Sequence, residues 1–586
     1  MLGSLLLLPL GCLALQAHAK SVIGHWMGGE TQRYTVDDYA ADMRLSKAVL
    51  IDAWAVNSGK DTYEQEHLDL LFEAAKQEGY KVTLSVDMLH WNVKGSSDLL
   101  IERLKRYAVK DEWLRFDGKP VLTTFSGNQQ GTFMDGVSTF KESNDLWNKV
   151  LDAAAEAVGS DFYFAPTWLS NKPLSDPDSA DLKMSGIANW FGHGEVGSRN
   201  NVTAEADVSW HDKAAARSLD YWAPVGASFQ VHQNDPETNY CYISGHFLLP
   251  TRYRSLIDLG PKAPENLYFI TLSDWGESTY IYPVRDNADP PKGTVDTAVY
   301  VRPADHFPFA LMSAYWNFEY KNGSPPTITS PVIMWYHRIT PAASTPTNDP
   351  LPKSKSCDGL YDNLYAVVFI PEGSTAKSLV FTTGGKALDA QDVQPGVNLL
   401  MAPFVVGETA VSLQDADGKV LLSGDGERIV ESTEIWDANY RAFAIPSDVM
   451  PSDFLDLGGS SSSGSGSSKA SSTVAVATTD AAATKVASTS AQATSRGAGS
   501  TTSSASDSNE ASTSAASSSS STTSWWVVLS LLTIVALVAL VLVTIVLVTI
   551  VRLVAAVIVI VRRPEQQHRR RALPLPPFLF LLPSFS

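Results

Sequence analysis

The stretch SDWGES, residues 273–278, follows the apolar run LYFITL and carries two carboxylates three positions apart, Asp274 and Glu277. Hydrolysis of an acetal needs one protonated carboxyl group that donates to the leaving oxygen. It also needs an ionised carboxylate that activates water or attacks the anomeric carbon. When two carboxyl groups lie close together, the charge of one raises the pKa of the other, which lets one stay protonated. A turn built from Asp, Gly and Ser requires no second carboxylate, so the pair predicts acid–base chemistry on a glycosidic bond.

Eight apolar runs separated by helical patterns must position this pair. The runs cover residues 22–27, 49–56, 81–88, 120–127, 161–168, 186–191, 221–229 and 267–275. Thr35 and Asp38 have capping-box spacing, and Leu68, Leu71 and Phe72 repeat with a helical period. Apolar strands that alternate with helices predict a parallel sheet, and eight such units favour an α/β fold of the (β/α)8 barrel type. An open doubly wound sheet is the alternative, because periodicity does not show closure.

Polar and aromatic residues gather where the predicted strands end, which in such a barrel is the active-site end. Aromatic rings mixed with carboxylates suit a carbohydrate, whose CH faces stack on indole rings while its hydroxyls need hydrogen-bond partners. Each Trp also has a structural alternative, because a Trp at a strand end can pack against the barrel rim. The residues predicted to bind substrate are His25, Trp26, Asp87, Trp91, Trp168, Trp190 and Trp275.

Longer motifs surround these residues. SDWGESTYI follows the last strand, GHWMGG and YTVDDYAADMRLSKAVLIDAWAVNSG lie near the start, and VTLSVDM, DGKPVLTTFSG and FYFAPTW lie between them. Together they resemble the fungal α-1,3-glucanases, or mutanases, of glycoside hydrolase family 71. The resemblance implies a barrel followed by a β-sandwich that hydrolyses cell-wall α-1,3-glucan with inversion, without a metal or organic cofactor. It also implies that Asp274 and Glu277 are the acid and base pair and that Asp87 is a sugar-binding residue beside the cleaved bond. We expect Glu277 to be the acid and Asp274 the base, with the reverse assignment as the alternative.

Three positions depart from the pattern of that family. Ser126 in TFSG and Thr167 in PTW stand where relatives usually have acidic residues, and His246 stands where another acidic residue is expected. Because of these changes, the alternative function is that of a wall-bound, carbohydrate-binding pseudoenzyme with the same barrel. A purely adhesive surface protein is a third class, but adhesion gives no reason for the acid pair.

Residues 352–446 change to short alternating runs separated by Gly, Pro and Asp, with Asp417-Gly418 at a hairpin position. The pattern predicts a barrel domain at 20–351 and a small β-sandwich at 352–458. We expect the sandwich to dock on the barrel as a structural appendage.

Cys241 and Cys357 are compatible with one disulfide or with two buried thiols.

The ends of the chain carry targeting and anchoring patterns. Residues 1–19 have the apolar run and small-residue triplet of a signal peptide. Residues 459–524 are rich in Ser, Thr, Ala and Gly, which predicts a disordered stalk. Residues 525–551 contain no charge and predict a transmembrane segment, followed by a basic cytoplasmic tail at 552–586. A lipid-anchor signal and a mis-assigned gene end are the alternatives at this terminus.

The patterns at the two ends predict an extracellular, membrane-anchored protein, and the family resemblance implies α-1,3-glucan as its partner. The formal net charge of -18 argues against nucleic acid as a partner and suits a neutral ligand. The oligomeric state is not indicated by the sequence.

Overall fold

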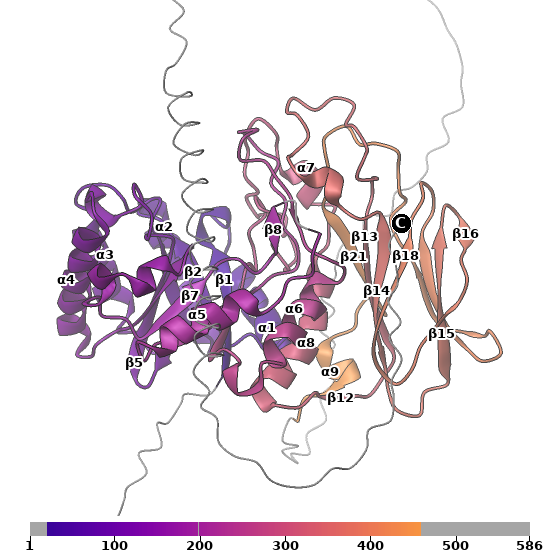
Figure 1. Ribbon diagram of the computed structural model, residues 1–586, viewed down its shortest axis with the longest axis horizontal. Helices are drawn as coiled ribbons and strands as arrows, with labels where there is room; N and C mark the ends of the chain where they lie inside the picture. Colours follow the sequence, from indigo (N-terminus) through magenta and orange to yellow (C-terminus); the bar gives the residue numbers. More distant parts are fainter. Residues whose placement is uncertain (1–19, 197–198, 459–586) are drawn as a thin grey trace, which may run out of the picture. The chain divides into compact units, whose positions relative to one another are not determined.

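The structure, a computed structural model, describes residues 20–196 and 199–458 (Figure 1). The predicted signal peptide, stalk, membrane segment and basic tail lie outside these residues. Across 20–196 and 199–458, no helix has the length and apolar character needed to cross a membrane.

Eight parallel strands form a closed barrel, as the alternating pattern predicted. They are β1 (Ser21–Met27), β2 (Ala53–Ser58), β3 (Lys81–Asp87), β5 (Lys119–Phe125), β6 (Tyr163–Trp168), β7 (Gly186–Asn189), β9 (Asp220–Val225) and β11 (Asn266–Phe269). Neighbours pair in the order β3-β2-β1-β11-β9-β7-β6-β5, and β5 also pairs with β3, which closes the ring. Closure excludes the open doubly wound sheet. The short β4 (Arg115–Phe116) pairs antiparallel with β5.

Helices connect the strands and surround the barrel (Figure 1). They are α1 (Val36–Ala48), α2 (Thr62–Glu78), α3 (Ser96–Tyr107), α4 (Phe140–Val158), α5 (Glu205–Ala215), α6 (Leu248–Ile257), α7 (Ala298–Val301) and α8 (Phe307–Asn322). Thr35 and Asp38 form the predicted capping box of α1. Gly79 ends α2 in the left-handed conformation that glycine adopts readily. Between β6 and β7 the chain makes the short 3-10 turns η3 (Lys172–Ser175) and η4 (Pro177–Ser179).

The barrel strands separate their side chains into two layers. Ile23, Ala53 and Tyr268 belong to a cluster inside the barrel, whereas Val22 and Trp54 belong to the larger core between the strands and the helices. Successive residues of a strand point to opposite faces, so adjacent residues at a strand end are divided between these layers. This alternation decides which predicted site residues can face the barrel mouth.

Two antiparallel sheets follow the barrel and form the predicted sandwich (Figure 1). The first contains β18 (Gly396–Pro403), β14 (Asn363–Ile370), β13 (Val332–Arg338) and β21 (Tyr440–Ile445) in that order. The second contains β15 (Ala376–Thr383), β19 (Ala410–Asp415), β20 (Val420–Asp425), β16 (Lys386–Ala387) and β17 (Gln391–Asp392). The hairpin predicted at Asp417-Gly418 joins β19 to β20. Smaller elements are β8 (Glu195–Val196), β10 (Tyr242–Ile243), β12 (Thr327–Ile328), β22 (Leu455–Asp456) and α9 (Pro451–Phe454).

Strand β13 was not predicted, and it lies before the proposed boundary at residue 352. Val332 and Met334 pack into the core shared with the barrel helices, while Ile333 and Trp335 pack into the sandwich interior. A strand buried on both faces has no alternation of apolar and polar residues, so period-2 patterning gives no signal for it. The sandwich therefore begins earlier in the chain than its alternating strands indicate.

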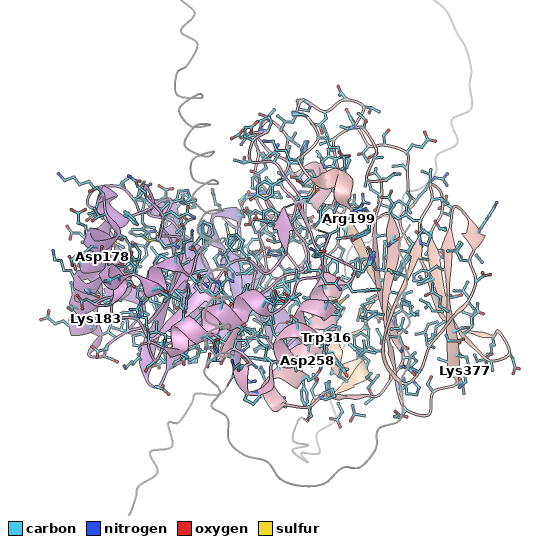
Figure 2. The ribbon with its side chains drawn as sticks, in the orientation of Figure 1. Asp178, Lys183, Arg199, Asp258, Trp316 and Lys377 are labelled. Carbon is cyan, nitrogen blue, oxygen red and sulfur yellow. A yellow bond between two sulfur atoms is a disulfide. The ribbon has the colours of Figure 1, made fainter. Side chains whose placement is uncertain are left out.

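The first sheet packs directly against α8, and barrel and sandwich belong to one compact unit. Phe369 of β14 lies with its ring centroid 5.7 Å from that of Tyr315 and 6.4 Å from that of Trp316. Figure 2 labels Trp316 on α8. Helix α8 is apolar on nearly every side, as expected for a helix covered on both faces. Cys241 and Cys357 form a disulfide and are not two separate buried thiols. The sandwich is docked on the barrel, as expected.

Candidate active site

Asp274 and Glu277 lie on the turn that follows β11, at the active-site end of the barrel. Met27 N donates to Ser273 Oγ (2.9 Å), which ties the turn to the end of β1. Asp274 N donates to Thr271 Oγ1 (2.8 Å). The Asp274 side chain is almost completely buried, whereas Glu277 keeps part of its surface exposed. The chain segment that carries both acids is thus anchored on the strands themselves.

The two carboxyl groups have different hydrogen-bond environments. Asp274 accepts from Glu277 N (2.8 Å) and from Gly276 N, whereas Glu277 Oε2 is buried with no hydrogen-bond partner among the described residues. Burial raises the pKa of Asp274 to about 6, and the two N–H donors limit the rise. Burial and the nearby Asp274 charge raise the pKa of Glu277 well above its usual value. These shifts favour proton retention by Glu277 over Asp274.

A third carboxyl group, Glu30, adjoins the pair and was not predicted. It follows β1 in the 3-10 turn η1 (Gly28–Glu30), and its Oε2 accepts from Trp275 N (2.8 Å). Burial, together with the charges of Asp274 and Glu277, raises the pKa of Glu30 well above its usual value. The expectation that polar residues directly after a barrel strand face the active site, applied to GGE at residues 28–30, could have found it.

Gly276 allows Glu30 and the turn to approach closely. A Cβ at this position would lie 2.5 Å from Gln233 Nε2 and 3.3 Å from Glu30 Oε1. A larger residue here would displace the ends of the Gln233 and Glu30 side chains.

His25 points into the barrel and Asp87 ends β3 near it. His25 Nδ1 and Tyr268 Oη share a hydrogen bond of 2.6 Å, while His25 Nε2 has no partner among the described residues. Burial lowers the pKa of His25 to about 3, despite the charge of Asp87, so the imidazole is neutral at neutral pH. His25 Nε2 is therefore a buried polar atom without a partner among the described residues, since none of the His25 surface is exposed.

Only one of the five predicted tryptophans faces the barrel interior. Trp190 packs with its ring centroid 4.9 Å from that of His25 and 4.6 Å from that of Phe125. The other four have at most 2% of their surface exposed and belong to the core between strands and helices: Trp26, Trp91, Trp168 and Trp275. Trp26, for example, stacks on Trp54 at 4.0 Å. Because His25 points inward, its neighbour Trp26 must point outward. We assign these four a packing role.

Two tyrosines of the β9–α6 connection lie near Glu277 and were not predicted. Tyr240 and Tyr242 are partly exposed and pack around Phe229, with ring centroids 5.3 and 4.5 Å from it. Burial raises the pKa of both tyrosines, and the charge of Glu277 adds to the rise. They lie in a long connection rather than at a strand end, so strand-end reasoning could not find them.

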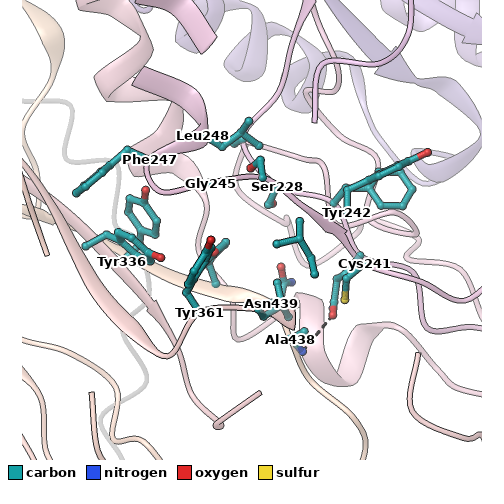
Figure 3. Close-up of a pocket in the computed structure, with 18 residues that line it drawn as sticks. Ser228, Cys241, Tyr242, Gly245, Phe247, Leu248, Tyr336, Tyr361, Ala438 and Asn439 are labelled. Atoms are coloured by element: carbon teal, nitrogen blue, oxygen red, sulfur yellow. Dashed lines mark hydrogen bonds between the residues drawn. The ribbon is translucent and has the colours of Figure 1, made fainter. Parts of the chain in front are cut away.

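Tyr242 lines two hollows, with volumes of about 40 and 640 Å³. The first lies between the β9–α6 connection and the sandwich, and its lining includes Tyr336, Tyr361 and Asn439 (Figure 3). The lining of the second includes Asn189 and Phe191. Asp274 and Glu277 line neither hollow.

The sequence profile of glycosyl hydrolase family 71 matches residues 18–452. The chain belongs to glycosyl hydrolase family 71. The glucan endo-1,3-alpha-glucosidase agn1 of Schizosaccharomyces pombe is 26% identical over 423 residues, which cover 72% of this chain and 93% of that protein. A mutanase of Penicillium rubens is 25% identical over 424 residues, which cover 71% and 86%.

Among solved structures, the GH99 endo-alpha-mannosidase from Bacteroides thetaiotaomicron is 15% identical, with a TM-score of 0.38. The alignment covers 52% of this chain and 97% of the mannosidase. So low a TM-score supports no inference about fold or function.

The three positions expected to depart from the family 71 pattern make contacts away from the acid pair. Thr167 Oγ1 lies 3.1 Å from Thr123 Oγ1 inside the barrel. Ser126 is buried, and its Oγ has no hydrogen-bond partner among the described residues. His246 Nδ1 shares a hydrogen bond of 3.0 Å with Tyr365 Oη of the sandwich. None of these contacts involves the turn at 274–278.

Proposed function

We propose that this family 71 glycosidase cleaves the α-1,3-glucosidic bonds of fungal cell-wall glucan, with Glu277 as acid and Asp274 as base. One observation carries the assignment of roles: Asp274 is satisfied by backbone N–H groups while the buried Glu277 Oε2 has no hydrogen-bond partner among the described residues. N–H donors stabilise an ionised carboxylate, and an apolar surrounding favours a protonated one. The α-1,3-glucanase names of the curated relatives support the substrate.

The proposed reaction is a single displacement with inversion. Asp274 takes a proton from a water molecule whose oxygen forms a bond to the anomeric carbon. The bond from that carbon to the glycosidic oxygen breaks, and Glu277 transfers its proton to the leaving oxygen. Product release and proton exchange with solvent then restore Asp274 as carboxylate and Glu277 as acid.

Substrate contacts are proposed for side chains around the mouth. Neutral His25, Asp87 and the Trp190 edge are suited to the sugar at the cleaved bond, because they offer polar groups and an aromatic surface together. Tyr240 and Tyr242 are suited to stacking on the neighbouring sugar units, since they are partly exposed and lie near Glu277.

An extracellular location fits the chain. The Cys241–Cys357 disulfide is of the kind that persists in oxidising compartments. Removal of residues 1–19 and anchoring through residues 525–551 are part of the proposal and rest on the sequence pattern alone.

The test is incubation of the secreted 20–458 fragment with insoluble α-1,3-glucan, with chromatography of the released sugars and NMR detection of the first anomer formed. We expect oligosaccharides or glucose of inverted configuration, lost in Asp274→Asn and Glu277→Gln. Retained configuration would refute inversion. Binding of glucan without any released sugar would instead favour the pseudoenzyme, with Ser126, Thr167 and His246 as the positions to restore.

A further inference from the structure

The segment after β9 holds the backbone of the catalytic turn from one side. Gln230 N donates to Glu277 O (3.0 Å), and Ser228 Oγ donates to Ser278 O (2.9 Å). Gln230 Nε2 lies 3.5 Å from Ser278 Oγ, a long hydrogen bond. Glu30 holds the same turn from the barrel side through Trp275 N. The direction of the Glu277 side chain therefore depends on contacts from two sides.

Ser278 shows why these contacts matter. Its φ is 53°, in the left-handed region that residues other than glycine rarely adopt. Such a conformation persists when surrounding interactions over-determine it, and the bonds from Ser228 and Gln230 do so here. Ser278 directly follows Glu277, so relaxation of this residue would redirect the carboxyl group.

The sandwich reaches the turn through the Gln230 side chain. Ala438 N donates to Gln230 Oε1 (3.1 Å), the bond drawn as a dashed line at Ala438 in Figure 3. Only 4% of the Gln230 surface is exposed. One end of its amide is thus held by the sandwich, while the other end faces the catalytic turn. Next to Ala438, Asn439 Nδ2 donates to Tyr280 Oη (3.1 Å), which follows the same turn.

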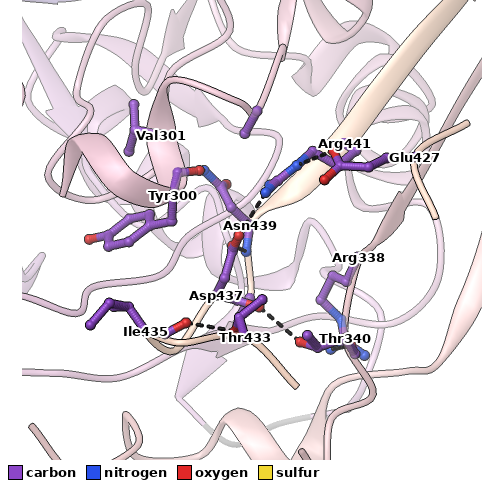
Figure 4. A network of polar contacts seen from close by, with 12 residues as sticks. Tyr300, Val301, Arg338, Thr340, Glu427, Thr433, Ile435, Asp437, Asn439 and Arg441 are labelled. Carbon is purple, nitrogen blue, oxygen red and sulfur yellow. Dashed lines mark hydrogen bonds and ion pairs between the residues drawn. The ribbon is translucent and has the colours of Figure 1, made fainter. Parts of the chain in front are cut away.

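Ala438 is itself held by a buried polar network (Figure 4). Asp437 accepts from Arg441 Nη2 (2.7 Å) and from Asn439 N (2.9 Å). The Asp437 carbonyl accepts from Thr340 Oγ1 (3.1 Å). Because bonds on both sides fix its neighbours, the Ala438 N–H is presented to Gln230 in a set direction.

We propose that Gln230 is a positioning residue for Glu277, through which the β-sandwich sets the geometry of the acid pair. The inference rests on the proposed function and deepens it: the sandwich is part of the catalytic machinery, not only an appendage. Glutamine suits the position because its amide offers an acceptor to Ala438 and a donor to Ser278.

The test uses Gln230→Met in the full-length protein purified in detergent. Methionine keeps the length of the side chain but removes both hydrogen bonds. Gln414→Met, at a partly exposed position, is the control, because among the described residues the Gln414 amide bonds only Ser412 within the second sheet. We expect kcat on α-1,3-glucan to fall by roughly 10- to 100-fold in Gln230→Met, with KM changed by less than about twofold, because misplaced catalytic groups slow chemistry rather than binding. The control should match the native protein.

Two further readouts separate positioning of the acid from general damage. An α-1,3-linked glucooligosaccharide with a dinitrophenolate leaving group needs little proton donation, so Gln230→Met should lose only a few-fold in kcat on it. Hydrogen exchange of the peptide spanning 274–282 should be faster in Gln230→Met than in the control. Equal losses on both substrates would refute acid positioning.

The outcomes also separate this inference from the proposed function. If the native protein cleaves glucan and Gln230→Met cleaves it at the native rate, the inference is wrong and the function stands. If the native protein cleaves nothing, the proposed function fails. In that case hydrogen exchange decides the inference: unchanged exchange at 274–282 overturns it, and faster exchange supports it.

Discussion

Asp274→Asn should inactivate the enzyme and at the same time stabilise it at neutral pH. The pKa of Asp274 rises from 3.8 to about 6 because the carboxyl group is buried. At 1.36 kcal/mol per pKa unit, this rise corresponds to about 3 kcal/mol of destabilisation once the group is ionised. The pKa of Asp274 is higher in the folded than in the unfolded protein. The protonated carboxyl group therefore contributes its full stability to the folded protein below about pH 4, and this contribution is lost as pH rises through 6. Asparagine avoids that loss because it does not ionise.

Urea unfolding at pH 4 and pH 7.5 measures this effect. We expect Asp274→Asn to raise the free energy of unfolding by up to about 3 kcal/mol at pH 7.5 and by little at pH 4. Asp392→Asn, at an exposed position on β17, is the matched control and should change neither value. A variant less stable than the native protein at pH 7.5, or a gain of equal size at pH 4, would refute the reasoning.

Three other predictions follow from the same geometry. Glu277→Gln should lower kcat by about 10²- to 10⁴-fold. In a plot of kcat/KM against pH, this variant should lose the fall in rate at alkaline pH but keep the fall at acidic pH near the Asp274 pKa. Trp26→Ala should lower the free energy of unfolding by about 3 to 5 kcal/mol with little change in activity per folded molecule, whereas Trp190→Ala should raise KM. The reverse result would mean that the inward-facing and outward-facing tryptophans are wrongly assigned. Barrel and sandwich should unfold in one calorimetric transition because they share a core and a disulfide, and two well-separated transitions would contradict the docking.

Much of the barrel was predictable because its signals are local. Apolar runs, capping boxes and terminal glycines depend on residues a few positions apart, and all eight predicted runs became barrel strands. The acid pair could be proposed for the same reason: Asp274 and Glu277 lie three positions apart on one turn. Strand β13 was missed because a strand buried on both faces lacks the local alternation that marks the other sandwich strands.

The side on which each strand-end residue lies was decided by the fold. His25 and Trp26 are adjacent in the chain, yet one points into the barrel and the other packs on Trp54 outside it. Alternation states that they must differ, but only strand pairing and barrel closure determine which one faces inward.

The sequence by itself determined the family motifs, the order of strands and helices, and the presence of two acids after the last barrel strand. Tertiary structure alone decided that Glu30 joins those acids from the first strand and that Gln230 links them to the sandwich. Glu30 and Trp275 are 245 positions apart, and Gln230 and Ala438 are 208 apart. Hydrogen bonds over such separations leave no periodic trace in the chain, because they depend on how whole elements pack and not on neighbouring residues.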